Sequence, residues 1–187
     1  ENGLIWDKNK CEKKTYGDIA TFASAKNQVE LCATYHFQSQ DNPGSYAADF
    51  AKVTVDTLTG LVKVDDFVAV HDVGKAINPM FVEGQILGGI QMGIGMAISE
   101  CMPVNGKGNI VNDRLSKYHV INAPDMPNAR VFLIEKGEEH GPYGAKSVGE
   151  IATVPVAAAV VNAINDALKT NLTDLPLTPE KIINEIK

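Results

Sequence analysis

The sequence predicts an α+β fold in which packed helices cover a mixed sheet. Residues 51–65 alternate polar and apolar side chains around a Thr-Gly turn, which is typical of a β-hairpin. A long apolar helix is expected from Pro79, and a second apolar helix is expected over residues 154–169. A sheet and helices of this kind bury their apolar faces by packing against one another, so we expect a single layered core.

Composition excludes several classes of protein. The chain has 187 residues, of which 44% are hydrophobic and 21% charged, as in folded globular proteins. Its net charge of -6 has the wrong sign for nucleic acid or an anionic membrane, and the longest apolar run, residues 86–98, is too short to span a bilayer. The three cysteines lack the spacing of zinc or iron–sulfur sites, and residues 1–4 show no signal peptide. We therefore expect a cytoplasmic protein with neither nucleic acid nor membrane as partner.

The first elements in order are a helix, an edge strand and the hairpin. Thr15 followed by Asp18 is a capping signal, so a helix is expected over residues 15–26. Residues 28–37 favour an edge strand, in which Cys32 is a buried small hydrophobe. The second hairpin strand then becomes wholly apolar at residues 67–70, which predicts that it enters a buried layer.

The helix expected over residues 79–100 is rich in glycine. Asn78 suits its N-cap and Pro79 its first position. Each glycine in a helix interior costs about 1 kcal/mol relative to alanine, so a close approach by another backbone or by a flat ligand is expected. The glycines are Gly84, Gly88, Gly89, Gly93 and Gly95.

The second half of the chain holds a strand and two helices. Residues 130–135 are expected to form a strand, and residues 136–140 a solvated charged turn. The helix over residues 154–169 is apolar almost all round, which predicts that it is buried. A final short helix is expected from Pro179, with Thr178 as its N-cap.

Residues 141–150 have the composition of an anion or cofactor cradle. Three glycines leave backbone N–H groups free to face an anion, and the following helix presents its positive end. Glu150 lies between this loop and a very apolar segment, so its carboxylate is expected to be partly desolvated, as a general base requires. The structural alternative is a glutamate that starts a helix, where the helix dipole favours it.

Three other polar residues admit both a functional and a structural interpretation. Gln85 and Gln91 stand beside glycines. In the functional interpretation, their neutral amides donate hydrogen bonds to a ligand oxygen. In the structural interpretation, they are ordinary surface side chains. His71, followed by Asp72, is either an acid–base or ligand residue or a strand-end histidine with a local role.

An ordered set of motifs resembles the xanthine dehydrogenase / aldehyde oxidoreductase family of molybdenum hydroxylases. More narrowly, residues from about Thr15 onward resemble the C-terminal part of the molybdopterin-binding catalytic subunit. The motifs are His71-Asp72-Val73-Gly74, Ile77-Asn78-Pro79, Gly84-Gln85, Gln91-Met92-Gly93-Ile94-Gly95 with Glu100, the segment 141–150, and Leu177-Thr178-Pro179-Glu180.

The resemblance implies a role for several residues. Glu150 matches the catalytic glutamate, the base toward a hydroxyl on the molybdenum, and Gln85 matches a glutamine that hydrogen-bonds the cofactor. No residue of this chain is implied as a metal ligand. The loop implied to lie against the pterin consists of Ala145, Lys146, Ser147, Val148 and Gly149. The family usually has glycine in place of Ser147.

The resemblance also implies an activity, cofactors and partners. The chain would be a C-terminal molybdenum cofactor-binding domain over residues 1–187, either a split subunit or a fragment, with the upstream half of the catalytic subunit absent. It would help to hydroxylate a heteroaromatic or aldehyde carbon with oxygen from water, using molybdopterin, alone or as the cytosine dinucleotide, with molybdenum.

The expected partners are the remainder of the molybdopterin subunit and the subunits or domains that carry [2Fe–2S] clusters and FAD. The isolated chain is expected to be inactive. Two alternatives are a non-catalytic cofactor-binding or assembly module of the same fold and an unrelated nucleotide-binding domain, which the absence of a P-loop pattern disfavours.

Overall fold

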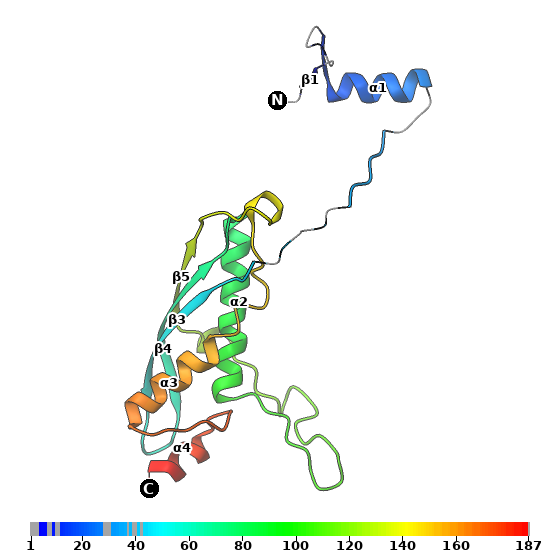
Figure 1. The fold of residues 1–187 in the computed structure, drawn as a ribbon. Helices are drawn as coiled ribbons and strands as arrows, with labels where there is room; N and C mark the ends of the chain where they lie inside the picture. Colours follow the sequence, from blue (N-terminus) through cyan, green and yellow to red (C-terminus); the bar gives the residue numbers. More distant parts are fainter. Residues whose placement is uncertain are drawn as a thin grey trace. The chain divides into compact units, whose positions relative to one another are not determined.

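The computed structural model describes residues 4–6, 9, 12–27, 31–36, 38, 41 and 43–186 (Figure 1). The chain divides into two compact units, residues 1–38 and residues 39–187. Each unit is therefore described by itself.

The N-terminal unit contains a small hairpin and one helix. Strands β1 (Leu4–Trp6) and β2 (Lys13–Thr15) pair antiparallel, with Leu4 opposite Thr15. Helix α1 (Tyr16–Asn27) follows at once. The Thr15 N–H donates to Asp18 Oδ2, and the Asp18 N–H donates to Thr15 Oγ1, both at 3.0 Å. These reciprocal bonds satisfy free donors at the helix start, which confirms the capping signal in the sequence.

The strand predicted over residues 28–37 is not formed where the structure describes it. Residues 31–36 have no regular structure and are exposed, so the prediction that Cys32 is buried is also wrong. β-favouring side chains form a strand only where a neighbouring strand offers packing and hydrogen bonds, and residues 31–36 pair with none. Residues 28–30 and 37, and also Cys11, lie outside the described residues.

The C-terminal unit is built on a three-stranded mixed sheet. Strands β3 (Ala47–Val55), β4 (Val62–Asp72) and β5 (Asn128–Ile134) lie in that order. β3 and β4 form the predicted hairpin, whereas β5 pairs with β4 in parallel, with Asp66 opposite Asn128. The hairpin is longer than the sequence indicated, and β4 is the central strand, which explains its wholly apolar stretch over residues 67–70.

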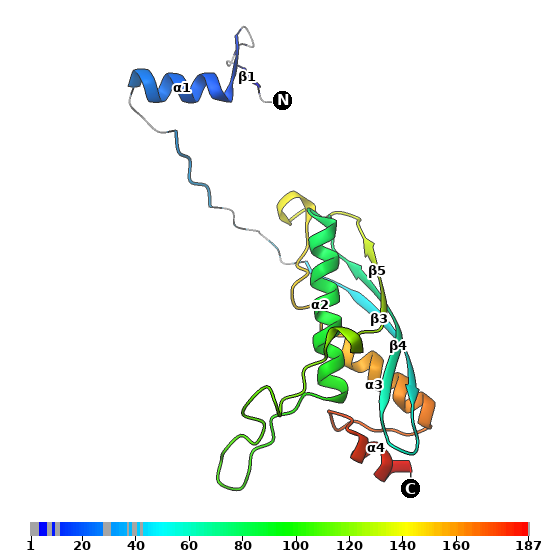
Figure 2. The same cartoon turned by 180° about the vertical axis from the view of Figure 1, so that it is seen from behind.

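Helices cover one face of this sheet (Figure 2). α2 (Pro79–Ile98) and α3 (Val156–Leu168) enclose the core with β4, where Phe67 packs with Ile90 and Val160. Two short 3₁₀ segments, Ala123–Asp125 and Pro142–Gly144, and the final helix α4 (Pro179–Ile186) complete the unit. The α+β fold with a mixed sheet is thus confirmed. α3 is buried along one side only, not all round, because its outer face is not covered within this unit.

Four of the five glycines of α2 fall into two groups, and a Cβ on the fifth, Gly95, would overlap the Glu100 side chain. A Cβ on Gly89 would lie 2.5 Å from the Ala152 carbonyl oxygen, and one on Gly93 would overlap Val156 at the start of α3. These two glycines allow the close backbone approach that the sequence predicts. Gly84 and Gly88 face open space, with nothing within 4 Å of an added Cβ.

α2 is long and apolar enough to cross a membrane by length and composition alone. Seven of its residues are nevertheless buried against the core of the unit, and Gln91 donates a hydrogen bond to the Ile121 carbonyl oxygen at 2.8 Å. It therefore packs as a core helix of this unit, with one face left uncovered.

Candidate functional site

The site is built at the corner where β4 leads into α2. The Val73 N–H donates to the Ile134 carbonyl oxygen at 3.1 Å, so the sheet pairing continues one residue past β4. Gly74 then turns the chain with a φ of +65°, and a Cβ there would lie 2.5 Å from the Gly144 carbonyl oxygen. Only glycine combines this conformation with this approach. The turn leaves Lys75 exposed and leads to Asn78, which caps α2 by accepting the Phe81 N–H at 3.3 Å.

Lys146 anchors the loop 141–150 to this corner. Its backbone N–H donates to the Val73 carbonyl oxygen at 3.0 Å, and its ammonium lies 2.6 Å from Asp72 Oδ2 and 3.2 Å from the Gly44 carbonyl oxygen. The Lys146 side chain is only 10% exposed. The hydrogen bond from Lys146 lowers the pKa of Asp72, and in turn raises the pKa of Lys146. Both groups therefore stay charged near neutral pH, and each neutralises the other.

The same loop is held from two further sides. Ser45 Oγ donates to the Ser147 carbonyl oxygen at 2.8 Å, which ties the loop to the segment before β3. Gln85, on α2, donates from Nε2 to the Gly149 carbonyl oxygen at 3.3 Å. Gln85 thus lies beside the residue that precedes Glu150.

Only part of the loop is available as the anion cradle that its glycines predict. The N–H groups of Gly144, Ala145 and Lys146 already donate to carbonyl oxygens of Gly141, Pro142 and Val73. α3 begins at Val156, after a run of turns, so its N-terminus does not directly follow the loop. An anion held by these three N–H groups would have to break the bonds that shape the loop.

Glu150 is exposed and lies in the turns before α3. Its carbonyl oxygen accepts the Thr153 N–H at 3.0 Å, and no acidic residue occupies the first turn of α3. The helix-starting interpretation of Glu150 is therefore wrong. The desolvation expected of this carboxylate is not provided by the described residues of this chain, since its side chain faces solvent.

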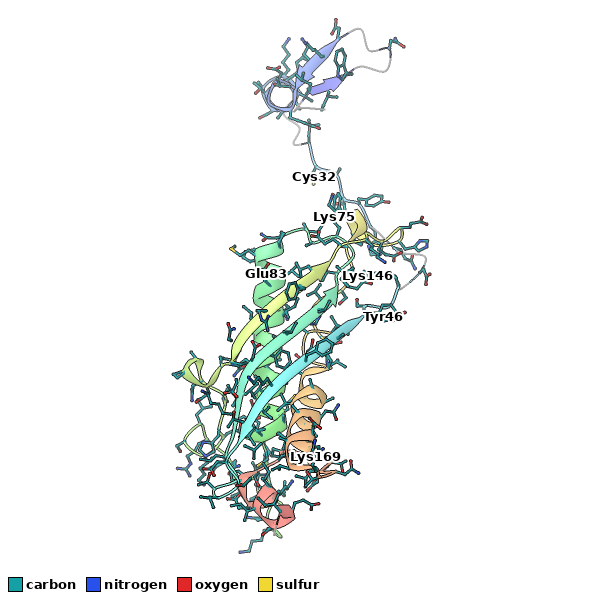
Figure 3. The ribbon with its side chains drawn as sticks, turned by 90° about the vertical axis from the view of Figure 1, so that its left-hand side faces the viewer. Cys32, Tyr46, Lys75, Glu83, Lys146 and Lys169 are labelled. Carbon is teal, nitrogen blue, oxygen red and sulfur yellow. The ribbon has the colours of Figure 1, made fainter. Side chains whose placement is uncertain are left out.

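A pocket of about 310 Å³ adjoins these residues. Four of the residues predicted to contact cofactor line it, namely Gln85, Ala145, Lys146 and Val148. The other three predicted site residues do not line it and are exposed, namely Ser147, Gly149 and Glu150. Its remaining walls are largely apolar, and no acidic side chain is among the described residues that line it. Figure 3 shows Lys75, Lys146 and Tyr46 at the same end of the C-terminal unit.

His71 is a buried strand-end residue and does not line this pocket. Its side chain and that of Asp49 are both fully buried, with Nε2 3.6 Å from Asp49 Oδ1. This supports the local structural interpretation of His71, while Asp72 pairs with Lys146 instead. Asp49 was not among the residues expected from the sequence, although it interrupts the apolar residues on the inward face of β3, which is the pattern that could have indicated it.

Comparison with known proteins assigns the family. Residues 1–127 match the family of the molybdopterin cofactor-binding domain. The chain therefore belongs to this family, whose cofactor is molybdopterin.

Relatives and solved structures agree with this assignment. The chain is 36% identical over 157 residues to a putative xanthine dehydrogenase molybdenum-binding subunit of Escherichia coli K12, a match that covers 83% of this chain and 21% of the relative. It is 38% identical over 138 residues to the nicotine 6-hydroxylase large subunit of Paenarthrobacter nicotinovorans, covering 72% and 17%. Quinoline 2-oxidoreductase from Pseudomonas putida 86 superposes with a TM-score of 0.84 at 30% identity, covering 98% of this chain and 25% of that one. The chain thus spans about a fifth of the length of these curated relatives.

The pocket and its surroundings fit an organic pterin group. Six of the ten lining residues are apolar, the Gln85 side chain offers a neutral amide, and Gly84 leaves the adjacent helix surface open to a flat ring. Within the described residues, no group of three His, Cys, Asp or Glu side chains is placed to hold a metal ion. The features that match the cofactor are therefore those that would contact its organic part.

Proposed function

We propose that residues 1–187 form the C-terminal cofactor-binding domain of a molybdenum hydroxylase catalytic subunit, whose upstream half completes the site. The complete cytoplasmic enzyme would hydroxylate a heteroaromatic or aldehyde carbon with oxygen from water. One observation supports the proposal: Gln85 on α2 is hydrogen-bonded to Gly149, so its amide lies next to the residue that precedes Glu150, although the two come from distant parts of the chain.

The cofactor, when bound, would supply the two-electron oxidation of the substrate carbon. Glu150 would accept the proton that is released as the water-derived oxygen attacks this carbon. Gln85 uses one amide N–H on Gly149, which leaves its second N–H and its Oε1 for the cofactor. Lys146 would position the loop through Asp72, and its charge would not contribute to the reaction.

The exposure of Glu150 explains why a partner is needed. A carboxylate in water is a weak base, and exclusion of water strengthens it. The remainder of the molybdopterin subunit would cover Glu150, and subunits or domains with iron–sulfur clusters and FAD would take up the electrons. The isolated chain is expected to hydroxylate no substrate, and turnover by the purified chain alone would contradict the proposal.

The test is Glu150→Gln in the assembled enzyme. The substitution keeps the size of the side chain and removes the base, so turnover is expected to fall by about 10²–10⁴-fold while molybdenum content stays unchanged. Glu139→Gln, an exposed carboxylate in the preceding turn, is the matched control and is expected to keep full turnover.

Two results would contradict the assigned role of Glu150. Unchanged turnover in Glu150→Gln would favour a non-catalytic cofactor-binding or assembly module. Parallel loss of molybdenum and turnover would make Glu150 a structural residue and not a base.

A further inference from the structure

Lys75 lines the pocket beside Gln85 and carries a positive charge that no ion pair neutralises among the described residues. Two lysines line this pocket, and the ammonium of Lys146 is held by Asp72 at 2.6 Å. Lys75 is exposed, and among the described residues it forms no ion pair. Its charge is therefore available to a ligand.

The lining of the pocket around Lys75 favours an anion. The Glu135 carboxylate at this corner accepts the Ala76 N–H at 2.9 Å and does not line the pocket. No acidic side chain lines the pocket among the described residues, and none lies in the first turn of α2. The start of this 20-residue helix carries partial positive charge and is close in sequence to Lys75, since Asn78 is its N-cap. Within the loop 141–150, the N–H groups of Gly144, Ala145 and Lys146 are already bonded and do not compete for the anion.

We propose that Lys75 binds the phosphate of the molybdenum cofactor at the mouth of this pocket. The inference rests on the proposed function, since it places the cofactor against Gln85 and the loop. Molybdopterin carries a phosphate monoester, which becomes a pyrophosphate in the dinucleotide form, and both are anions that an ammonium group binds as a point charge. Lys75 is thus a cofactor-positioning residue and takes no part in the proton transfer assigned to Glu150.

The experiment measures how much pterin the assembled enzyme retains. Wild type, Lys75→Ala, Lys75→Arg and Lys107→Ala are dialysed at increasing salt concentration, and the pterin that remains is measured by the fluorescence of its oxidised form. Lys107 is the matched control, an exposed lysine in the loop after the opposite end of α2. Lys75 is exposed, so its removal is not expected to unfold the domain, and circular dichroism checks this.

Lys75→Ala is expected to hold the cofactor about tenfold to a hundredfold more weakly, the range for loss of a charge-assisted hydrogen bond. The pterin retained by Lys75→Ala should also depend less on the salt concentration than in wild type, because the variant lacks one ionic contact with the cofactor. Lys75→Arg keeps the charge and is expected to restore retention, and Lys107→Ala is expected to match wild type.

The outcomes separate the two proposals and the two phosphate sources. Equal retention by wild type and Lys75→Ala would overturn the role of Lys75 and leave the proposed function intact. Absence of pterin from the wild-type enzyme would overturn the proposed function and the inference together. If Lys75 binds the phosphate, the pH dependence of pterin retention distinguishes the two phosphate sources. A phosphate monoester takes up a second proton below about pH 6, so retention of the pterin weakens there. A pyrophosphate does not, so retention of the pterin is independent of pH in that range.

Discussion

Alanine substitutions at the glycines of α2 test the packing of the domain most directly. Gly84→Ala and Gly89→Ala gain the same helix propensity, about 1 kcal/mol, because both positions are interior to the helix. Gly84 faces open space, so Gly84→Ala is expected to raise the free energy of unfolding by about that amount.

At Gly89 the new methyl group would lie 2.5 Å from the Ala152 carbonyl oxygen, whereas ordinary contact begins at 3.4 Å. The helix and the backbone before α3 must therefore separate by the difference, 3.4 - 2.5 = 0.9 Å. Overpacking of this kind costs about 1–3 kcal/mol, and the backbone carbonyl has no rotamer by which to move aside. The propensity term cancels between the two variants, so Gly89→Ala should be about 1–3 kcal/mol less stable than Gly84→Ala.

Urea unfolding followed by far-UV circular dichroism measures this difference. Gly88→Ala provides a second open position and is expected to behave like Gly84→Ala. Equal stabilisation at Gly84 and Gly89 would refute the close packing of α2 on the segment before α3. A gain in stability at Gly84 that is accompanied by loss of bound pterin would indicate that this glycine serves the cofactor and not the fold.

Three further predictions concern the corner and the buried pair. Asp72→Asn removes the ion pair with Lys146, so the wild-type domain should have the higher free energy of unfolding above about pH 4. This difference is lost as the pH falls through the lowered pKa of Asp72. It is also lost as the pH rises past about 10.4 and through the raised pKa of Lys146. Urea midpoints across this pH range check it, and a difference independent of pH would contradict it. His71→Ala opens a cavity beside the buried Asp49 side chain, so it is expected to destabilise the domain by about 2–5 kcal/mol. Replacing both residues by leucine should recover most of this loss, and equal unfolding midpoints of wild type and His71→Ala would contradict the prediction. Asn78→Ala removes the cap of α2 and is expected to cost about 1 kcal/mol in the same assay, unless the Phe81 N–H finds another acceptor.

The elements that the sequence predicted correctly carry their signals locally. Thr15 with Asp18, and Asn78 with Pro79, are caps made within one helical turn, and the alternation around Gly60 fixes the hairpin. The edge strand over residues 28–37 was wrong where it is described, because a strand depends on a partner that may be far away in sequence or in another chain.

The sequence predicts the candidate site as a set of residues but does not predict its geometry. The motifs identified Gln85 and the loop 145–149, and the structure joins them at Gly149. The pairing of Lys146 with Asp72 and the burial of Asp49 against His71 are long-range contacts, which no local pattern encodes. The solvent exposure of Glu150 could not be predicted from the neighbouring sequence either, because it depends on which segments pack over this residue.

The parallel pairing of β5 with β4 determines when the site can form as the chain folds. β3 and β4 join through a short turn, but β5 reaches β4 only after α2 and the loop that follows it, with Asp66 opposite Asn128. Contacts this distant in sequence close late, because the intervening loop must lose its freedom first. Val73 is hydrogen-bonded to Ile134 through its N–H and to Lys146 through its carbonyl oxygen. The loop 141–150 therefore packs against a strand that is itself completed late. A newly made chain would therefore have its core helix before it has a surface able to receive the cofactor, and cofactor insertion would follow folding.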